Sequence, residues 1–341
     1  MLIVRDLNRF SPDKETPLIL ALGNFDGIHR GHQALLKHAI GEANRRKGKS
    51  AVLSFEAHPQ HILHPESKPP LLTSQDHRLF LLNQTGIDIC FLVSFTKEFS
   101  KLTPHQFVRD ILVEKLHISE ICLGDNARFG YKRQGNATLL KALAKEYGFQ
   151  FTEIKAVEAG GDIVSSSRIR RLIQEGKLEE AETCLGRPLS VLARVIPGKG
   201  RGTELGFPTA NLDIETEVLP PFGVYPVYAR AVLNSENYNE KKGIYEFPVC
   251  QWGAWFEGVM NFGVRPTFQE RESQGILEIF LLDFQGDLYQ KTLEVVIFPR
   301  IREERTFPDA EDLKRQIQRD IQNAREFLKK ARKKAFTKID K

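Results

Sequence analysis

Hydrophobic and polar positions follow two different patterns along the chain, and the pattern changes near residue 186. Up to about residue 155, short apolar runs alternate with longer stretches in which apolar residues recur at helical spacing. Strands that alternate with helices in this way predict βαβ units and a parallel sheet. The expected strands are 18–22, 51–55, 89–93 and 121–123, and the expected helices include 33–46 and 104–116.

Beyond residue 186 the apolar runs are short and are separated by Gly, Pro, Asn and Asp. This pattern is typical of a small antiparallel barrel or sandwich. A helix with an apolar stripe is expected over 166–184, where Gly186-Arg187-Pro188 ends it, and a last helix is expected from near Asp309. The expected strands of this region are 189–195, 223–233, 258–262, 277–282 and 293–298.

A chain of 341 residues is longer than one typical hydrophobic core supports, so two domains are expected. The first, residues 1–185, is predicted to be an α/β domain with a Rossmann-like parallel sheet. The second, residues 186–341, is predicted to be a small antiparallel β-barrel followed by a C-terminal helix.

The composition is that of a soluble globular protein, with 41% hydrophobic and 27% charged residues. The longest apolar runs, such as Leu18 to Leu22, are far too short to span a bilayer, and the charges at Arg5, Asp6 and Arg9 do not fit a secretory signal. The four cysteines lie far apart without a CxxC motif, which is typical of buried thiols in a reducing compartment. We therefore expect a cytoplasmic protein with no membrane partner.

The net charge of +5 raises the alternative of a nucleic-acid-binding protein. Eight Lys and Arg but only two acids lie from Arg325 to the end, and the remaining chain carries 41 basic and 42 acidic side chains. The excess is therefore confined to a C-terminal tail. Because Lys and Arg near the end of a helix interact favourably with its dipole, a solvated helix end explains the tail better than nucleic-acid binding does.

The first candidate site lies in the stretch LGNFDGIHRGHQALL, where a buried strand ends at Gly23 and a helix opens near His32. Gly27 and Gly31 allow the backbone to approach a ligand closely. His29 and His32 are three residues apart, so both imidazoles can donate to one phosphate beside the positive end of the helix. The sequence therefore predicts a phosphate site here in preference to an incidental surface turn.

The second candidate site begins with a glycine-rich loop in the stretch PGKGRGTELGFPTAN. The loop is not a Walker A sequence, because Gly-Lys-Ser/Thr does not follow at the required spacing. Taken alone, it fits a tight hairpin as well as a phosphate loop. A more specific signal is Glu278, which lies in an otherwise apolar strand, where a carboxylate without a function is unusual.

Four motifs of the first domain resemble the bacterial bifunctional riboflavin kinase/FAD synthetase family, which belongs to the wider nucleotidylyltransferases with an HxGH motif. They are GNFDGIHRGH, FEAHP, FGYKRQGN and VSSSRIR. The resemblance implies catalysis by His29, His32 and Asn126, and flavin binding by Arg133. One position departs from the family pattern, because Ala127 stands where a phenylalanine is common. The residues for which the resemblance implies ATP or phosphate binding are Gly23, Phe25, Gly31, His58, Ser165, Ser166, Ser167, Arg168 and Arg170.

The second domain resembles the riboflavin kinases of the same family. GFPTAN is similar to their PTAN motif, which implies that Thr209 and Asn211 ligate Mg²⁺ and the ATP phosphates; both are hard-oxygen ligands of the kind that Mg²⁺ prefers. Glu278 aligns with the family's catalytic base. The remaining expected residues are Gly198, Gly200 and Gly202 around the phosphates, and Tyr225, Arg302, Glu304 and Phe307 where the family binds flavin or closes the site.

The function that this resemblance implies is the synthesis of FAD in two steps. Riboflavin would be phosphorylated by ATP to FMN, and FMN would then be adenylylated by a second ATP to FAD and pyrophosphate, both with Mg²⁺. A first alternative keeps the HxGH chemistry but uses another phosphorylated acceptor, although the PTAN segment and Glu278 count against it. Small-molecule substrates are therefore expected, and a homo-oligomer is compatible with the sequence.

Two further segments have competing interpretations. His58, His61 and His64 are spaced like zinc ligands on one helix face, but two prolines within the segment make a long helix, and hence a metal site, implausible. The aromatic stretch Tyr245–Trp255 fits either a lid on the flavin side or a satellite hydrophobic cluster, and the cluster is favoured.

Overall fold

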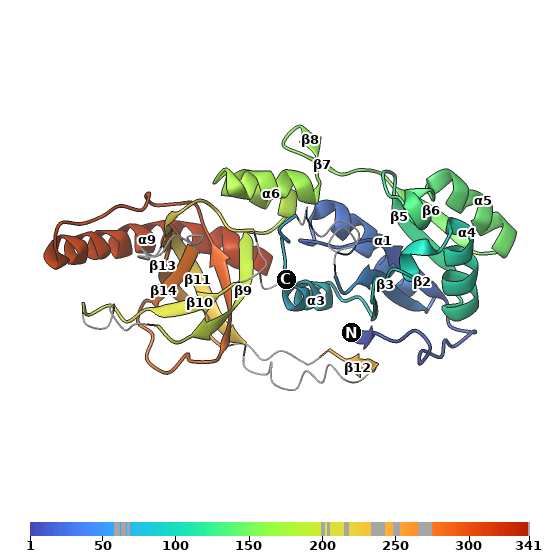
Figure 1. Ribbon diagram of the computed structural model, residues 1–341, viewed down its shortest axis with the longest axis horizontal. Coiled ribbons are helices and arrows are strands. Elements are labelled where there is room, and N and C mark those ends of the chain that lie inside the picture. The colour runs from blue at the N-terminus through green and yellow to red at the C-terminus, as the bar shows by residue number, and fades with distance from the viewer. Residues whose placement is uncertain are drawn as a thin grey trace. The chain divides into compact units, whose positions relative to one another are not determined.

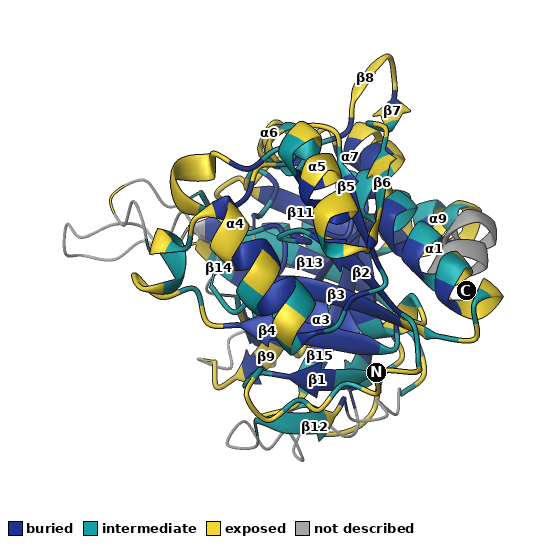
Figure 2. Ribbon diagram, turned by 90° about the vertical axis from the view of Figure 1, so that its right-hand side faces the viewer, coloured by how far each residue is buried: buried dark blue, intermediate teal, exposed yellow. Residues whose placement is uncertain are grey.

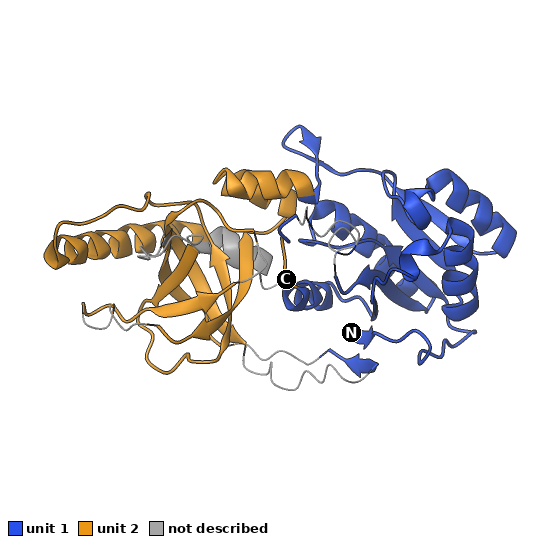
Figure 3. Ribbon diagram, viewed as in Figure 1, with its two compact units in different colours: residues 1–71, 75–166, 237–248 blue, residues 72–74, 167–236, 249–341 orange. Residues whose placement is uncertain are grey.

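The structure is a computed structural model of the 341-residue chain. Two compact units make up the molecule (Figure 3). Unit 1 comprises Met1–Leu71, Gln75–Ser166 and Asn237–Pro248, and unit 2 comprises Leu72–Ser74, Ser167–Glu236 and Val249–Lys341. The structure describes residues 1–57, 62, 66, 69–198, 202, 205–214, 218–232, 243–247, 253–264 and 275–339, with the side chains of the last helix up to Ala331.

In the part of unit 1 that the structure describes, the centre is a seven-stranded sheet with the order β12-β1-β4-β3-β2-β5-β6 (Figure 1). All neighbouring strands are parallel except β12, which pairs antiparallel with β1. This confirms the predicted α/β domain with a parallel sheet. The strands are β1 (Leu2–Val4), β2 (Leu18–Leu22), β3 (Lys49–Phe55), β4 (Ile89–Val93), β5 (Glu120–Gly124), β6 (Gln150–Ile154) and β12 (Ile244–Glu246).

The apolar runs of the central strands are continuous because both faces of the sheet are covered. Every residue of β2 and β4 is buried, and these strands are dark blue in Figure 2. The covering helices begin at recognisable caps: Thr103 forms a capping box with Gln106, and Asn136 caps the helix that starts at Ala137. The helices of unit 1 are α1 (Arg30–Arg45), α3 (Gln75–Gln84), η2 (Phe99–Lys101), α4 (Pro104–Gln106) continued by the π-helix η3 (Phe107–Lys115), η4 (Tyr131–Arg133) and α5 (Ala137–Tyr147), and a small hairpin is formed by β7 (Glu158–Ala159) and β8 (Asp162–Ile163).

The strand order of this sheet reverses between β2 and β5. From β2 the chain proceeds to β3 and β4 on one side, and it then returns to place β5 and β6 on the other side of β2. In open α/β sheets, ligands bind beyond the carboxyl ends of the strands at such a reversal. The turn that follows β2 and the residues that follow β5 therefore emerge at the edge where a ligand is expected.

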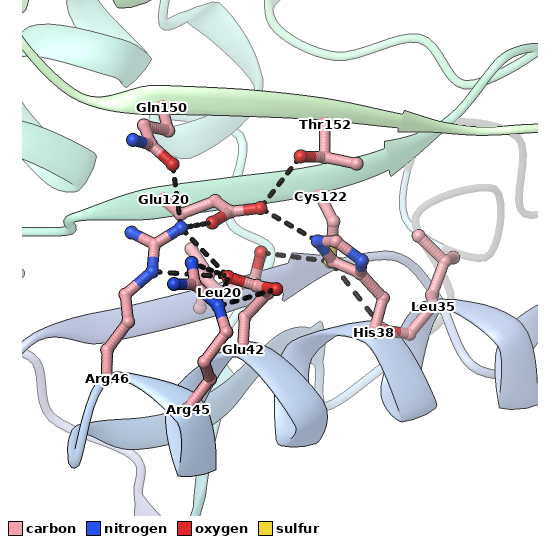
Figure 4. A network of polar contacts seen from close by, with 10 residues as sticks. All are labelled: Leu20, Leu35, His38, Glu42, Arg45, Arg46, Glu120, Cys122, Gln150 and Thr152. Carbon is pink, nitrogen blue, oxygen red and sulfur yellow. Dashed lines mark hydrogen bonds and ion pairs between the residues drawn. The ribbon is translucent and has the colours of Figure 1, made fainter.

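A buried carboxylate at the other end of β5 fixes α1 on the sheet (Figure 4). Glu120 is 1% exposed, and its Oε1 accepts from the Thr152 hydroxyl at 2.7 Å and lies 2.8 Å from Nε2 of His38. Its other oxygen accepts from Arg46, which also donates to the Gln150 side chain at 2.7 Å. The network holds the last turns of α1, and α1 in turn carries the candidate histidines at its opposite end.

The described strands of unit 2 close into an antiparallel barrel with the order β10-β14-β13-β11-β15-β9, which confirms the predicted second fold. Along β14 the residues alternate, with Leu277, Ile279 and Leu281 buried and the residues between them half-buried. The strands are β9 (Leu189–Ile196), β10 (Ala210–Asp213), β11 (Gly223–Val232), β13 (Phe256–Val264), β14 (Gly275–Leu281) and β15 (Thr292–Ile297), and the C-terminal helix is α9 (Ala310–Ile339).

One expectation about a helix was wrong in part. The helix expected over 166–184 is two helices, α6 (Ser166–Gln174) and α7 (Leu178–Leu185), because Gly176 adopts a φ of 75° between them. Of the aromatic stretch, Tyr245 lies in β12, opposite Ile3 of β1. Trp255, in contrast, does pack on a cluster, which contains Tyr228, Val296, Phe298 and Leu328.

Among the helices that the structure describes, none combines the length and the apolar character that a bilayer crossing requires.

Candidate active sites

The turn between β2 and α1 has an unusual backbone. Three of its residues have positive φ values, Phe25 at 53°, Gly27 at 83° and Ile28 at 41°. This conformation is ordinary for glycine, but for a non-glycine residue it costs roughly 1–3 kcal/mol and persists only where neighbours hold it. Side chains that hold the turn include Ser54, whose hydroxyl donates to the Asn24 carbonyl at 3.1 Å, and Ser166, whose hydroxyl donates to the Asp26 carbonyl at 3.1 Å.

The two histidines of the turn lie against each other. His29 is the N-cap of α1, and its Nδ1 accepts from the His32 backbone N–H at 3.4 Å. Their rings stack with centroids 3.7 Å apart and 16° between the planes, and the Phe25 ring lies 5.2 Å from that of His32. A Cβ at Gly31 would stand 3.2 Å from two atoms of the His29 ring, which is tighter than most such contacts. A side chain at position 31 would therefore press on the His29 ring and disfavour the stacked arrangement.

His32 is held as a neutral imidazole. Burial, together with the nearby His29 and the positive charge of Arg78, lowers the pKa of His32 well below its usual range. Its Nδ1 is buried, and it has no hydrogen-bond partner among the residues that the structure describes. A buried polar atom without a partner at a functional turn is a reason to expect a ligand there. A neutral imidazole donates through one nitrogen, which suits contact with a phosphate oxygen.

The second site is a cavity of about 440 Å³ in unit 2, between the outer face of β10, β13 and β14 and the helix α9. Strand register places three polar side chains in one row across its wall, because Glu278 of β14 lies opposite Asn211 of β10 on one side and Asn261 of β13 on the other. All three line the cavity. Glu278 is half-buried and Asn211 is 7% exposed. A carboxylate is therefore set between two amides at the wall of a largely apolar cavity.

Two described glycines of the glycine-rich loop, Gly198 and Gly202, lie against the PTAN segment. A Cβ at Gly198 would overlap the side-chain amide of Asn211, and one at Gly202 would come within 2.9 Å of the Thr209 hydroxyl oxygen. The loop is also joined to the segment by a 2.8 Å hydrogen bond from the Phe207 N–H to the Gly202 carbonyl. A larger residue at either position would therefore have to displace the segment that carries Thr209 and Asn211, the two predicted Mg²⁺ ligands.

Comparison with known proteins identifies the family of this chain. A family model described as FAD synthetase matches residues 11–168, and one described as riboflavin kinase matches residues 185–328. The bifunctional riboflavin kinase/FMN adenylyltransferase of Escherichia coli strain K12 is 36% identical over 328 residues, which cover 96% of this chain and 98% of that protein. The chain belongs to the bifunctional riboflavin kinase/FMN adenylyltransferase family. This confirms the resemblance seen in the sequence motifs.

Two further comparisons extend over nearly the same length. The family member of Listeria monocytogenes is 34% identical over 314 residues, covering 92% of this chain and 93% of that one. A crystal structure from Streptococcus pneumoniae, whose title names a macrolide-efflux protein, is 25% identical, with a TM-score of 0.77 and coverage of 95% of this chain and 98% of that chain. Both domains of the family are therefore present in one chain here.

Six of the residues predicted for the adenylyltransferase site lie at or against the turn. Gly23, Phe25, His29, Gly31 and His32 belong to the turn and the start of α1, and Ser166 contacts the turn through its hydroxyl. The remaining predicted residues lie at the start of α6 or after β5: Ser165 immediately precedes α6, Ser167, Arg168 and Arg170 lie in its first two turns, and Asn126 is an exposed residue two positions beyond β5.

Of three other positions that the sequence singled out in the first domain, the structure describes the surroundings of two. Arg133 is exposed in η4 with a φ of 59°. Ala127, where the family commonly has a phenylalanine, packs against the main hydrophobic core of unit 1. His58, like His61 and His64, lies outside the described residues.

The residues predicted for flavin binding in the kinase domain are brought together with one exception. Arg302, Glu304 and Phe307 line the cavity, and a Cβ at Gly263 would overlap the Glu304 carboxylate. Tyr225 is fully buried, and its hydroxyl donates to the Pro221 carbonyl. Because strand residues alternate between faces, the placement of Val224 in the cavity wall directs Tyr225 into the barrel interior. Tyr225 is thus not brought to the cavity wall, and Gly200 lies outside the described residues.

Two polar residues of the cavity, Asn261 and Asp320, were not among the predicted site residues. Asp320 of α9 is 2% exposed, and both of its carboxylate oxygens accept from Arg302, at 3.0, 3.0 and 2.8 Å. The guanidinium of Arg302 also lies 5.7 Å from the Phe307 ring centroid. A signal for Asp320 was present in the sequence, because its position falls on the apolar stripe of the last helix, between Ile317 and Ala324.

Proposed function

We propose that this chain makes FAD from riboflavin in two ATP-dependent steps, as the names of its relatives state for them. The barrel domain, residues 186–341, transfers the γ-phosphoryl group of ATP to riboflavin and gives FMN and ADP. The α/β domain, residues 1–185, lets the FMN phosphate attack the α-phosphorus of a second ATP and gives FAD and pyrophosphate. The observation that carries the proposal is the row of Asn211, Glu278 and Asn261 in the wall of the barrel cavity.

In the kinase step, Glu278 is the general base. Its carboxylate accepts the proton of the ribityl hydroxyl as the γ-phosphoryl group arrives. Thr209 and Asn211 provide hard oxygens for Mg²⁺, which typically takes only one or two protein ligands together with substrate phosphates and water. When bound, Mg²⁺ neutralises charge on the phosphates. Gly198 and Gly202 leave room for the phosphates beside these ligands, and Arg302 and Phe307 bind the flavin.

The adenylyl transfer requires no strong base, because a phosphate monoester is already an anion near neutral pH. Catalysis is therefore positioning of the two phosphates and stabilisation of the charge that develops between them. His29 and His32 donate from the turn. Ser165, Ser166 and Ser167 and the guanidinium groups of Arg168 and Arg170 supply further donors, and Asn126 contributes from the neighbouring strand end.

We place the protein in the cytoplasm, since its thiols suit a reducing compartment. Cys90, Cys122 and Cys184 are buried as free thiols, and burial raises the pKa of Cys90 and of Cys122 to about 12. Such thiols are inert toward oxidation.

The proposal is tested by incubating the purified chain with riboflavin, ATP and Mg²⁺ and separating the flavins over time. FMN is expected to appear first and FAD to follow, with one pyrophosphate released per FAD. Replacing riboflavin by phosphopantetheine or a nicotinamide mononucleotide tests the alternative acceptors. Consumption of one of these acceptors, with riboflavin and FMN unchanged, would contradict the proposal.

A further inference from the structure

A buried arginine that no sequence motif singled out joins the first active site to the sheet. Arg78 lies in α3, where every residue from His77 to Leu82 is buried, and it is 6% exposed. An arginine in such a place requires well-defined partners, because an uncompensated charge is costly to bury. Its guanidinium donates to the backbone at two different strand ends.

One nitrogen of the guanidinium reaches the turn, and the other reaches β3. Nη1 donates to the Asn24 carbonyl at 3.2 Å, and Nη2 donates to the carbonyls of Phe55 at 2.6 Å and Glu56 at 3.3 Å. The backbone hydrogen bonds between β2 and β3 end with the one from the Gly23 N–H to the Leu53 carbonyl, at 3.3 Å. Together with the Ser54 hydroxyl, which donates to the same Asn24 carbonyl at 3.1 Å, Arg78 thus connects β2 and β3 just where their own pairing ends.

The carbonyl that Arg78 holds belongs to the peptide bond before Phe25. Phe25 has a positive φ of 53°, a conformation that a bulky residue keeps only under external constraint. Its ring lies 5.2 Å from the ring of His32, which in turn stacks on His29. A shift of the Asn24 carbonyl would therefore change the position of Phe25 and, through it, that of the histidine pair.

We propose that Arg78 is a positioning residue for adenylyl transfer: it holds the turn at 24–28, and thereby His32, through a fork between the Asn24 and Phe55 carbonyls. This inference rests on the proposed FMN adenylyltransferase activity. Lysine cannot replace the fork, because its ammonium group is a single point charge, whereas the planar guanidinium presents separate donors in fixed directions. The charge of Arg78 has a second consequence, since it is one of the causes that keep His32 neutral.

Two substitutions separate the fork from the charge. Arg78→Lys keeps the positive charge and removes the fork, and Arg78→Met removes both. Arg46→Lys is the matched control, because Arg46 is also a largely buried arginine of unit 1 whose contacts, to Glu42, Glu120 and Gln150, lie at the other end of the sheet (Figure 4). Riboflavin kinase activity of the same chain serves as an internal control, because its residues lie in unit 2.

For each variant the kcat and the KM for ATP in FMN adenylylation are measured, together with riboflavin phosphorylation, the melting temperature and the His32 pKa by NMR. Arg78→Lys is expected to lose about 100-fold in the kcat of adenylylation, the size expected when reacting groups are misplaced by about 1 Å. Riboflavin phosphorylation is expected to stay near the wild-type rate, and Arg46→Lys is expected to change neither rate, even if it melts at a lower temperature.

The His32 pKa distinguishes positioning from electrostatics. It is expected to rise in Arg78→Met, where the positive charge is gone, and to stay low in Arg78→Lys, although both variants lose adenylylation. An Arg78→Lys protein with wild-type adenylylation would overturn the inference, as would a loss in Arg46→Lys as large as that in Arg78→Lys. If the wild-type chain itself does not convert FMN to FAD, the proposed function fails instead. Should Arg78→Met not fold, Arg78→Lys alone decides.

Discussion

The two candidate active sites of this chain are built in different ways. The site in unit 1 depends on the backbone of one short turn, in which Phe25 and Ile28 have positive φ values and two histidines stack at the start of α1. The site in unit 2 depends on strand register, which aligns side chains from three separate strands in one row. A turn is sensitive to anything that holds its peptide groups, whereas a row on a barrel is fixed by the hydrogen bonds of the whole sheet. Substitutions should therefore act on the two reactions separately.

The largest effect is expected for the carboxylate of the barrel row. Glu278→Gln should lower the kcat of riboflavin phosphorylation by about 10²–10⁴-fold, the range of a lost general base. Glu257→Gln is a control on the neighbouring strand β13, because Glu257 is half-buried but does not line the cavity. A steady-state assay of FMN formation from riboflavin measures both. Equal losses in the two variants would mean that the barrel, and not the base, had been damaged.

The comparable change in the turn is His32→Ala. Removing one placed donor to a developing charge costs about 10²–10³-fold, so FMN should accumulate while riboflavin phosphorylation continues. His105→Ala removes an exposed histidine of the same unit and should leave FAD formation unchanged. The ratio of FMN to FAD in a time course reports the outcome. An unchanged ratio in His32→Ala would place the adenylyl transfer elsewhere.

A smaller effect is expected for Asp320, the helix residue that orients Arg302, the arginine that we propose binds the flavin. Asp320→Asn keeps the size of the side chain but removes the negative charge to which Nε and Nη2 of Arg302 donate. The KM for riboflavin should therefore rise about tenfold, with a smaller change in kcat. Asp312→Asn, which breaks an exposed ion pair with Arg315 on the same helix, is the control. A rise in the KM for ATP alone would show that Arg302 faces the nucleotide.

The smallest effect concerns the stability of unit 1 as a function of pH. The pKa of His32 is lowered on folding, so the unfolded state binds more protons once the pH approaches the unperturbed value of about 6.5. Stability from this residue is therefore present above that pH and is lost as the pH falls below it. Thermal melts should show a shallower acid dependence for His32→Gln than for the wild type between about pH 7.5 and 5.5. Parallel curves would show that His32 is not held neutral.

The parts of the fold and of the sites that could be predicted are those encoded within a few consecutive residues. The apolar runs of β2 and β4 were predicted to the residue, and the glycines and histidines of the turn specify its geometry locally. Glu278 was identified because a carboxylate without a function is unusual in an otherwise apolar strand.

The parts that could not be predicted depend on contacts between distant segments. β12 pairs with β1 across more than 240 positions, as from Ile3 to Tyr245, and three residues carry too little pattern to show it. Tyr225 was predicted to bind the flavin because of the family resemblance, yet the alternation along β11 directs its side chain inward. Arg78 acts on backbone carbonyls, and a partner of that kind leaves no trace in the sequence around Asn24.

The independence of the two sites is tested most directly by the rate of FMN adenylylation in the Glu278→Gln protein, measured with FMN and ATP and without riboflavin. The wild-type rate is expected, because the turn that carries His29 and His32 contains none of the residues that line the barrel cavity. Loss of this rate together with riboflavin phosphorylation would contradict the assignment of one reaction to each domain.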